Sequence, residues 1–196
     1  MRKTIFILSS MAVMIAIAVV ACNSSTTDNK KQTATADSAA MVKRGSYLVN
    51  AMGCDDCHSP KRMGAHGPEI IPELRFSGFR HDGQLPPIDT SVIAKGWTLF
   101  APDFTSAAGV WGISYAGNIT SDATGIGNWT EQNFLRAIKQ GKLKGLENGR
   151  DLLPPMPWFV YKNLTDEDLK SIFAYLKTTK PVENVVPGPK SPAEIK

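Results

Sequence analysis

Cysteine is scarce in this sequence, with three residues among 196, at positions 22, 54 and 57. So few cysteines exclude the dense disulfide framework of a small secreted domain, and we expect no disulfide. Long runs of one charge are absent, and the formal net charge is only +4 at pH 7, so nothing points to a nucleic-acid partner. No internal repeat is visible, and the length favours one domain.

Two of the cysteines lie in the stretch Cys54-Asp55-Asp56-Cys57-His58. Cys-x-x-Cys-His is the attachment signature of a c-type haem, because the thiols add to two porphyrin vinyl groups and hold the histidine beneath the iron. Thiol-redox and zinc sites share the Cys-x-x-Cys spacing, but zinc would need two further ligands and a thioredoxin-like site a βαβ context. The sequence therefore predicts one covalent haem c on Cys54 and Cys57, with His58 as an iron ligand.

The N-terminal segment has the pattern of a targeting signal. Arg2 and Lys3 precede a mostly apolar run over residues 5–21, which predicts a signal peptide of the lipoprotein type over residues 1–21. Cys22 follows a small residue as in a bacterial lipobox, so we expect it to be lipidated. An uncleaved anchor is the alternative, since a run of 17 residues can just span a bilayer. Both interpretations predict a domain in the bacterial cell envelope or periplasm, tethered to a membrane.

A flexible tether and then a helix should follow. Residues 22–38 contain no aromatic residue and no aliphatic one larger than alanine, so they cannot bury enough surface to fold. Apolar residues at helical spacing predict a helix over residues 39–52, with Ser38 as its N-cap and Gly53 as its stop. Gly45 within this helix suggests that another helix approaches closely there.

The middle of the chain carries little periodicity. Residues 59–90 are rich in glycine and proline and predict an ordered loop. Residues 92–100 suggest a short strand, and residues 101–128 suggest short strands or a hairpin. We treat residues 69–128 as an insertion of unknown role.

Two further helices are better marked. Thr130 is a natural N-cap and Gly141 a stop for one of them. Thr165 caps the other, with Asp168 as the answering position of a capping box. The remaining residues, 182–196, are rich in proline and lysine and predict a loose tail.

Met156 is the candidate for the second axial iron ligand. It lies in the proline-rich stretch 152–158, where prolines fix φ and remove backbone donors, so a stiff loop presents one thioether. A core position for Met156 is the alternative. Met63 is too close to the haem motif in sequence to reach the opposite face, and His66 or His81 would give bis-histidine ligation instead.

A ligating histidine usually donates its second ring N–H to a carbonyl. The backbone of Pro68, ten residues after His58, is the expected acceptor. Haem propionates need donors, and we name Trp129 as a candidate cofactor contact. Trp111, Tyr115 and Arg150 are the others, and the sequence does not rank them.

Taken together, these motifs resemble those of class I c-type cytochromes. The shared elements are Gly45-x-Tyr47-Leu48, Cys54-x-x-Cys57-His58, Gly67-Pro68, the Met156 loop and the helix around Phe173 and Tyr175. A closer similarity, to the cytochrome subunits of membrane-bound alcohol and aldehyde dehydrogenases, rests on Asn118-Ile119-Thr120-x-Asp122, Thr124-Gly125-Ile126-Gly127-x-Trp129, Met156-Pro157-Trp158 and the stretch 164–169.

The resemblance implies a mainly α, class I cytochrome c fold over residues 39–181, with helices packed around one covalent haem. It implies His58/Met156 ligation and a crossing of the first and last helices, with Gly45 against the face 172–176. The dehydrogenase subunits carry several such modules, whereas this sequence has one.

The predicted function is that of a monohaem electron carrier without a substrate of its own. Its partners would be redox proteins, with a membrane-bound dehydrogenase or a terminal oxidase as candidates. A small haem peroxidase and a gas-binding or gas-sensing haem protein with a labile Met156 are the alternatives. The near-infrared band of methionine-ligated ferric iron would separate the carrier from both.

Overall fold

The computed structural model describes residues 37–195, and the compact unit that starts at Met41 holds every contact discussed below. The predicted signal peptide, the lipidated Cys22 and most of the tether lie outside the described residues. Within the described range, no helix is both long enough and apolar enough to cross a membrane.

The N-terminal helix is described over residues 37–51. Ser38 is already helical, so the prediction that it caps this helix is wrong. Gly53 adopts a left-handed conformation with φ 68, and the chain leaves the helix just before it, as predicted.

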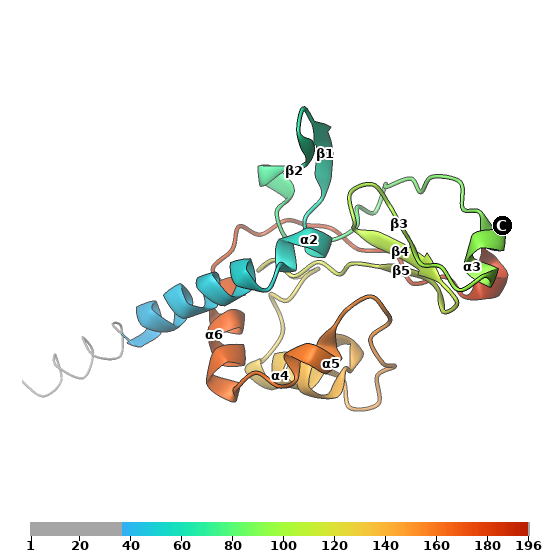
Figure 1. Cartoon of the computed structure of the whole chain (residues 1–196). Helices are drawn as coiled ribbons and strands as arrows, with labels where there is room; N and C mark the ends of the chain where they lie inside the picture. Colours follow the sequence, from blue (N-terminus) through green and yellow to red (C-terminus); the bar gives the residue numbers. More distant parts are fainter. Residues whose placement is uncertain (1–36, 196) are drawn as a thin grey trace, which may run out of the picture. The chain divides into compact units, whose positions relative to one another are not determined.

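This helix is crossed by α6 (Asp166–Leu176), as Figure 1 shows. A Cβ atom at Gly45 would collide with the carbonyl oxygen of Ser171 and lie 2.8 Å from Cβ of Tyr175. The predicted close approach at Gly45 is confirmed, although the nearest atoms belong to Ser171 and Tyr175 and not to Ile172 and Leu176. Around the crossing lies the main core: Leu48, Val49, Phe76, Ile126, Phe134, Leu135, Ile138, Leu169, Ile172 and Leu176.

The helix α4 (Glu131–Gln140) has the ends that the sequence predicts. Thr130 accepts from the backbone N–H of Asn133 in a capping box, and Gly141 ends the helix with φ 67. After the short 3₁₀ turn η2 (Leu143–Gly145), the chain reaches α5 (Trp158–Tyr161), which lies beside α4 (Figure 1).

One prediction for α6 holds and one is wrong. Thr165 accepts from the backbone N–H of Asp168 over 3.1 Å, as an N-cap should. The Asp168 carboxylate does not complete a capping box, because it accepts a hydrogen bond from Arg44 of the N-terminal helix over 2.9 Å. This ion pair adds to the helix crossing.

The middle of the chain is more ordered than the sequence suggests. Two small antiparallel sheets, β1-β2 and β3-β4-β5, stand beside the helices. Their strands and the short helices between them are β1 (Lys61–Gly64), β2 (Gly67–Ile70), η1 (Pro72–Leu74), α3 (Thr90–Ala94), β3 (Leu99–Phe100), β4 (Ser106–Gly109) and β5 (Gly112–Tyr115).

Residues 59–128 differ in part from the loop, the strand and the hairpin that the sequence predicts there. The loop over residues 59–90 contains the β1-β2 hairpin, which forms because Gly64 and Gly67 allow a tight reversal. The strand over residues 92–100 is wrong in its first part, since Asp89 caps a helix there through the backbone N–H of Ser91. The hairpin within residues 101–128 is confirmed as β4-β5.

The C-terminal tail is docked, so the prediction of a loose tail is wrong. The Asn184 side chain is 5% exposed and donates to the carbonyls of Ser77 and Phe79, both over 2.8 Å. Lys190 pairs with Ile113 of β5 in an antiparallel bridge, and η3 (Pro192–Glu194) follows. A buried amide that satisfies backbone groups thus holds the tail, together with the packing of Ile195 on Ile93, Ala108 and Ile113.

Asn184→Ala should therefore destabilise the protein by about 1–3 kcal/mol, because it leaves two buried carbonyls without donors. Val185→Ala is the matched control, since Val185 is 69% exposed. Urea unfolding of both variants measures the difference. Equal stabilities would show that the Asn184 hydrogen bonds do not stabilise the fold.

Candidate haem site

The haem motif itself is a short helix, α2 (Cys54–His58). The left-handed Gly53 precedes it and redirects the chain after the N-terminal helix. In helical geometry residues three and four apart share a face, so Cys54 faces the same way as Cys57 and His58. Both thiols are free and partly buried. A thiol pair and an imidazole thus stand together within one helical turn.

The His58 ring is fixed by a hydrogen bond to a distant segment. Its Nδ1 lies 2.7 Å from the carbonyl oxygen of Gly117. A carbonyl only accepts, so Nδ1 carries the proton and Nε2 keeps a free lone pair. Burial lowers the pKa of His58, which favours the neutral imidazole that binds metals.

Pro68 was expected to supply that carbonyl, and this prediction is wrong. Pro68 lies in β2, opposite Met63 in β1, and so belongs to the hairpin. The strand pairing that forms the hairpin carries its backbone away from the His58 ring. Gly117 takes its place, and the carbonyl of His58 itself accepts from the N–H of Gly78 over 2.8 Å.

The two thiols lie in a weakly solvated environment. Burial, with the nearby Asp55 charge, raises the pKa of Cys54 to about 12, and burial also raises the pKa of Cys57. Tyr161 of α5 lies close to both thiols. Burial raises the pKa of Tyr161, and the charges of Cys54 and Cys57 raise it further. The Tyr161 hydroxyl donates to the carbonyl of Met52 over 3.0 Å, which fastens α5 beside the start of α2.

An ion pair holds the N-terminal end of α2. The Asp55 carboxylate accepts from Nη2 of Arg75 over 2.6 Å and from the Ser59 hydroxyl over 2.6 Å. Burial raises the pKa of Asp55, but the hydrogen bonds from Arg75 and Ser59 outweigh it, and the pKa lies below its usual value. Ser59 in turn accepts from the buried N–H of Phe76.

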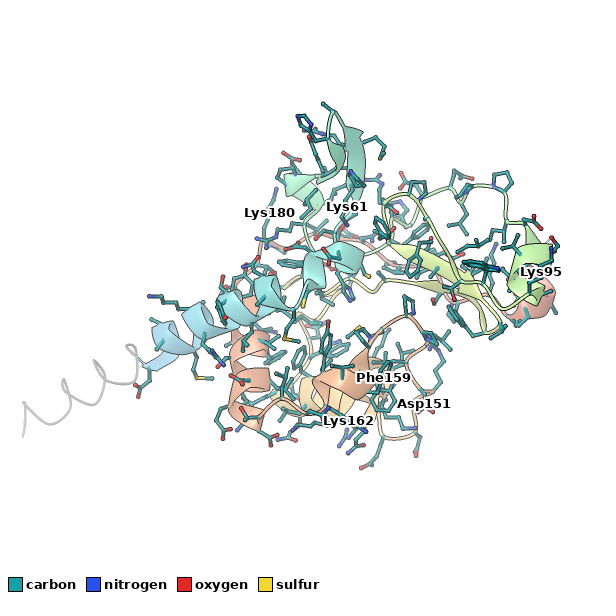
Figure 2. All side chains as sticks on the ribbon, in the orientation of Figure 1. Lys61, Lys95, Asp151, Phe159, Lys162 and Lys180 are labelled. Atoms are coloured by element: carbon teal, nitrogen blue, oxygen red, sulfur yellow. The ribbon has the colours of Figure 1, made fainter. Side chains whose placement is uncertain are left out.

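A lysine closes the other end of α2. Lys61 stands next to α2 (Figure 2), and its ammonium donates to the carbonyls of Asp55, Asp56 and Ser59 over 2.8–3.1 Å. A positive charge at a helix C-terminus is favourable because the terminal carbonyls lack partners. Nζ of Lys61 also lies 3.2 Å from the carbonyl of Asp103, so it joins α2 to the loop before β4.

Met156 lies in an anchored loop on the same core. Leu152 donates its N–H to the carbonyl of Gly141 over 2.6 Å, and the N–H of Met156 reaches the carbonyl of Leu153 over 3.3 Å. The Met156 side chain is partly buried and packs against the main core cluster, as does Cys54. The structure therefore brings Met156 and the attachment motif to one core.

The remaining candidates lie elsewhere or act differently. Met63 and His66 are exposed on the β1-β2 hairpin, and His81 is held by Asn184 of the tail. Trp129 packs on the main core cluster. Of the other propionate candidates, Trp111 donates to the Ser114 hydroxyl over 3.2 Å, whereas Arg150 donates to the adjacent Asp151 carbonyl.

Sequence reasoning missed the groups that hold the motif. Gly117 is 59 residues from His58, and a backbone carbonyl leaves no mark in a sequence. Arg75 and Lys61 are ordinary charged residues in a stretch without periodicity. The one usable signal was Asp55 within the motif, because a partly buried carboxylate there requires a cationic partner.

Comparison with known proteins gives the family. A family model described as cytochrome c matches residues 42–180. The chain belongs to the cytochrome c family. It binds c-type haem covalently, and the free thiols of α2 with the oriented His58 fit such a group.

Similar proteins are named as subunits of dehydrogenases. The chain is 34% identical over 152 residues to a fructose dehydrogenase cytochrome subunit of Gluconobacter japonicus, covering 76% of this chain and 23% of that protein. It is 32% identical over 137 residues to a gluconate 2-dehydrogenase cytochrome c subunit of Pantoea cypripedii, covering 69% and 22%. It is 27% identical over 145 residues to the cytochrome c subunit of a quinone-type alcohol dehydrogenase of Gluconobacter oxydans, covering 73% and 22%. This cytochrome thus spans less than a quarter of the length of these relatives.

Asp55→Asn should make the free energy of unfolding depend less on pH in the acid range. A carboxylate with a depressed folded pKa stabilises the protein above its unfolded pKa of about 3.9, and that contribution is lost as the pH falls through the folded value. Urea midpoints at several pH values from neutral to below about 3.9 measure this. Asp56→Asn, which removes the neighbouring exposed carboxylate without removing the Arg75 partner, is the control. If both variants keep the acid dependence of the parent, the Asp55–Arg75 pair contributes nothing.

Proposed function

We propose that this cytochrome is a monohaem electron carrier, with haem attached through Cys54 and Cys57 and the iron held by His58 and Met156. One observation carries the proposal: the His58 imidazole is fixed with a free Nε2 lone pair within one helical turn of two unpaired thiols. No other cysteine pair exists in the sequence to take the haem.

The residues on the two sides of the haem would have different tasks. When bound, the haem supplies an iron that changes by one electron between Fe(II) and Fe(III). His58 offers an imidazole whose orientation and basicity are set by the Gly117 carbonyl. Met156 offers a soft thioether, which favours the reduced state and raises the potential. Because prolines stiffen the Met156 loop, little rearrangement accompanies a change of charge.

A dehydrogenase is the proposed class of partner. Several relatives are named as cytochrome subunits of dehydrogenases for fructose, gluconate and alcohols, which supports an electron donor of that kind. We further propose that the domain works in the bacterial cell envelope, tethered through a lipidated Cys22. The basic, apolar and small-residue pattern of residues 1–22 supports this location.

Cys54→Ser and Cys57→Ser should each leave at most one thioether bond, because a hydroxyl does not add to the vinyl group as a thiol does. The yield of protein with haem should fall steeply in both variants. Haem-stained denaturing gels and mass spectrometry measure the attachment. Two thioether bonds at the parental level in either variant would refute the attachment site.

Met156→Ala should lower the potential by on the order of 0.1 V or more, within the range of ~0.8 V that axial ligands set. It should also abolish the near-infrared band and open the iron to CO. Potentiometry and CO titration of the haem-loaded protein test both effects, with Met63→Ala as a control that removes an exposed thioether. An unchanged potential without CO binding in Met156→Ala would mean that another residue is the ligand, and His66 and His81 would be tested next. Parental protein that binds CO readily would instead favour a ligand-binding function.

A further inference from the structure

One short segment of the insertion, residues 114–117, contacts both the loop that carries Met156 and the ring of His58. Ser114 in β5 donates from its hydroxyl to the carbonyl of Pro154 over 2.5 Å, two residues before Met156. Three residues after Ser114, the Gly117 carbonyl accepts from His58. The same stretch of backbone therefore meets the Met156 loop and the His58 ring.

This segment is itself firmly held. The N–H of Ala116 donates to the carbonyl of Thr105 over 2.8 Å, and its carbonyl accepts from the N–H of Phe79 over 2.9 Å. On the outer side of β5, Ile113 exchanges two backbone hydrogen bonds with Lys190, over 2.8 and 3.0 Å. Backbone hydrogen bonds thus hold Ala116 within the segment and Ile113 just before it, so the position of the segment is set by its neighbours and by the tail.

The stretch around Met156 needs a hydrogen-bond donor from another part of the protein. Prolines at 154, 155 and 157 have no N–H, so Met156 carries the one backbone donor of this stretch, and it is directed at Leu153. Residues 154–157 can therefore be fastened to the rest of the protein only through their carbonyls or their side chains. Ser114 supplies the hydroxyl proton for one of those carbonyls.

The geometry around Ser114 directs its single proton. Its hydroxyl lies 2.5 Å from the Pro154 carbonyl but 3.4 Å from the Ala107 carbonyl, so the proton belongs to the shorter bond. The indole N–H of Trp111 donates to the same hydroxyl oxygen over 3.2 Å. Ser114 is 8% exposed, which keeps water from replacing this bond.

We propose that the segment 114–117 sets the position of the Met156 loop relative to His58, and that Ser114 is the positioning residue for Met156. This inference rests on the proposed His58/Met156 ligation. An extended stretch of three residues spans about 10 Å, so the two contact points on this segment are held a fixed distance of that order apart. Without the hydroxyl, the loop keeps its anchor at Gly141 but loses the one nearest the thioether.

The test compares Ser114→Ala with Ser106→Ala in the full chain loaded with haem. Ser106 is the matched control, because it is a serine of the same sheet and is 4% exposed, but it lies on β4 opposite Tyr115. Losing one hydrogen bond should raise the population with Met156 detached by about two- to tenfold. CO binding to the ferrous protein should accelerate by that factor, and the near-infrared band of the ferric protein should lose intensity. Ser114→Thr, which keeps the hydroxyl, should restore both values.

The outcomes separate this inference from the proposed function. Ser114→Ala and Ser106→Ala with equal CO rates, whether parental or raised, would overturn the role of Ser114. If Met156→Ala changes neither the band nor CO binding, the ligation itself fails. Should Ser114→Ala not fold, Trp111→Phe removes only the indole donor to the hydroxyl, and it should accelerate CO binding in the same direction by a smaller factor. A parental CO rate in Trp111→Phe would then count against the inference.

Discussion

The hydrogen bond between His58 and the Gly117 carbonyl ties the haem motif to the far end of the insertion. It spans 59 residues, so it forms only when the chain between them has folded. That chain includes both small sheets, and the carbonyl reaches the ring because β5 runs directly into Gly117. The insertion is thus a structural support of the haem motif, in addition to any surface that it offers to a partner.

The C-terminal tail supports the same segment from behind. Asn118, next to Gly117, donates from its side chain to the carbonyl of Val182 over 2.8 Å, and its side-chain oxygen accepts from Thr120. Asn184 binds the stretch that follows Phe76 and, through its own N–H, Thr124. Both asparagines are buried, and a buried amide is stable only when its donors and acceptors are matched. The backbone that presents the carbonyl to His58 is therefore fixed by these polar groups together with the apolar packing of Tyr115 on Phe79 and of Ile119 on the main core.

The sequence distance over which a contact acts explains what the sequence could and could not predict. Helix ends at Thr130, Gly141 and Gly53 were predictable because caps and stops act within a few residues. The close approach at Gly45 was predictable because a glycine within an amphipathic helix needs a reason. Gly117 and Asn184 were not, since a carbonyl or an amide acts here across many residues without any periodic pattern. The order of the tail and of the loop after the haem motif escapes prediction for a related reason. Their apolar residues follow no helical or strand period, and long-range hydrogen bonds such as those of Asn184 help to order them.

The short helix α2 shows how far this polar framework extends. Five residues are too few for a helix to be stable alone, and α2 contains no buried residue of its own. Its ends are instead held by Arg75 on Asp55 and by Lys61 on the terminal carbonyls. Since Lys61 also reaches Asp103 before β4, the insertion contacts α2 at its end as well as at the His58 ring. The helix that carries both thiols is thus held in place by groups outside it, which is the condition for a fixed iron environment during electron transfer.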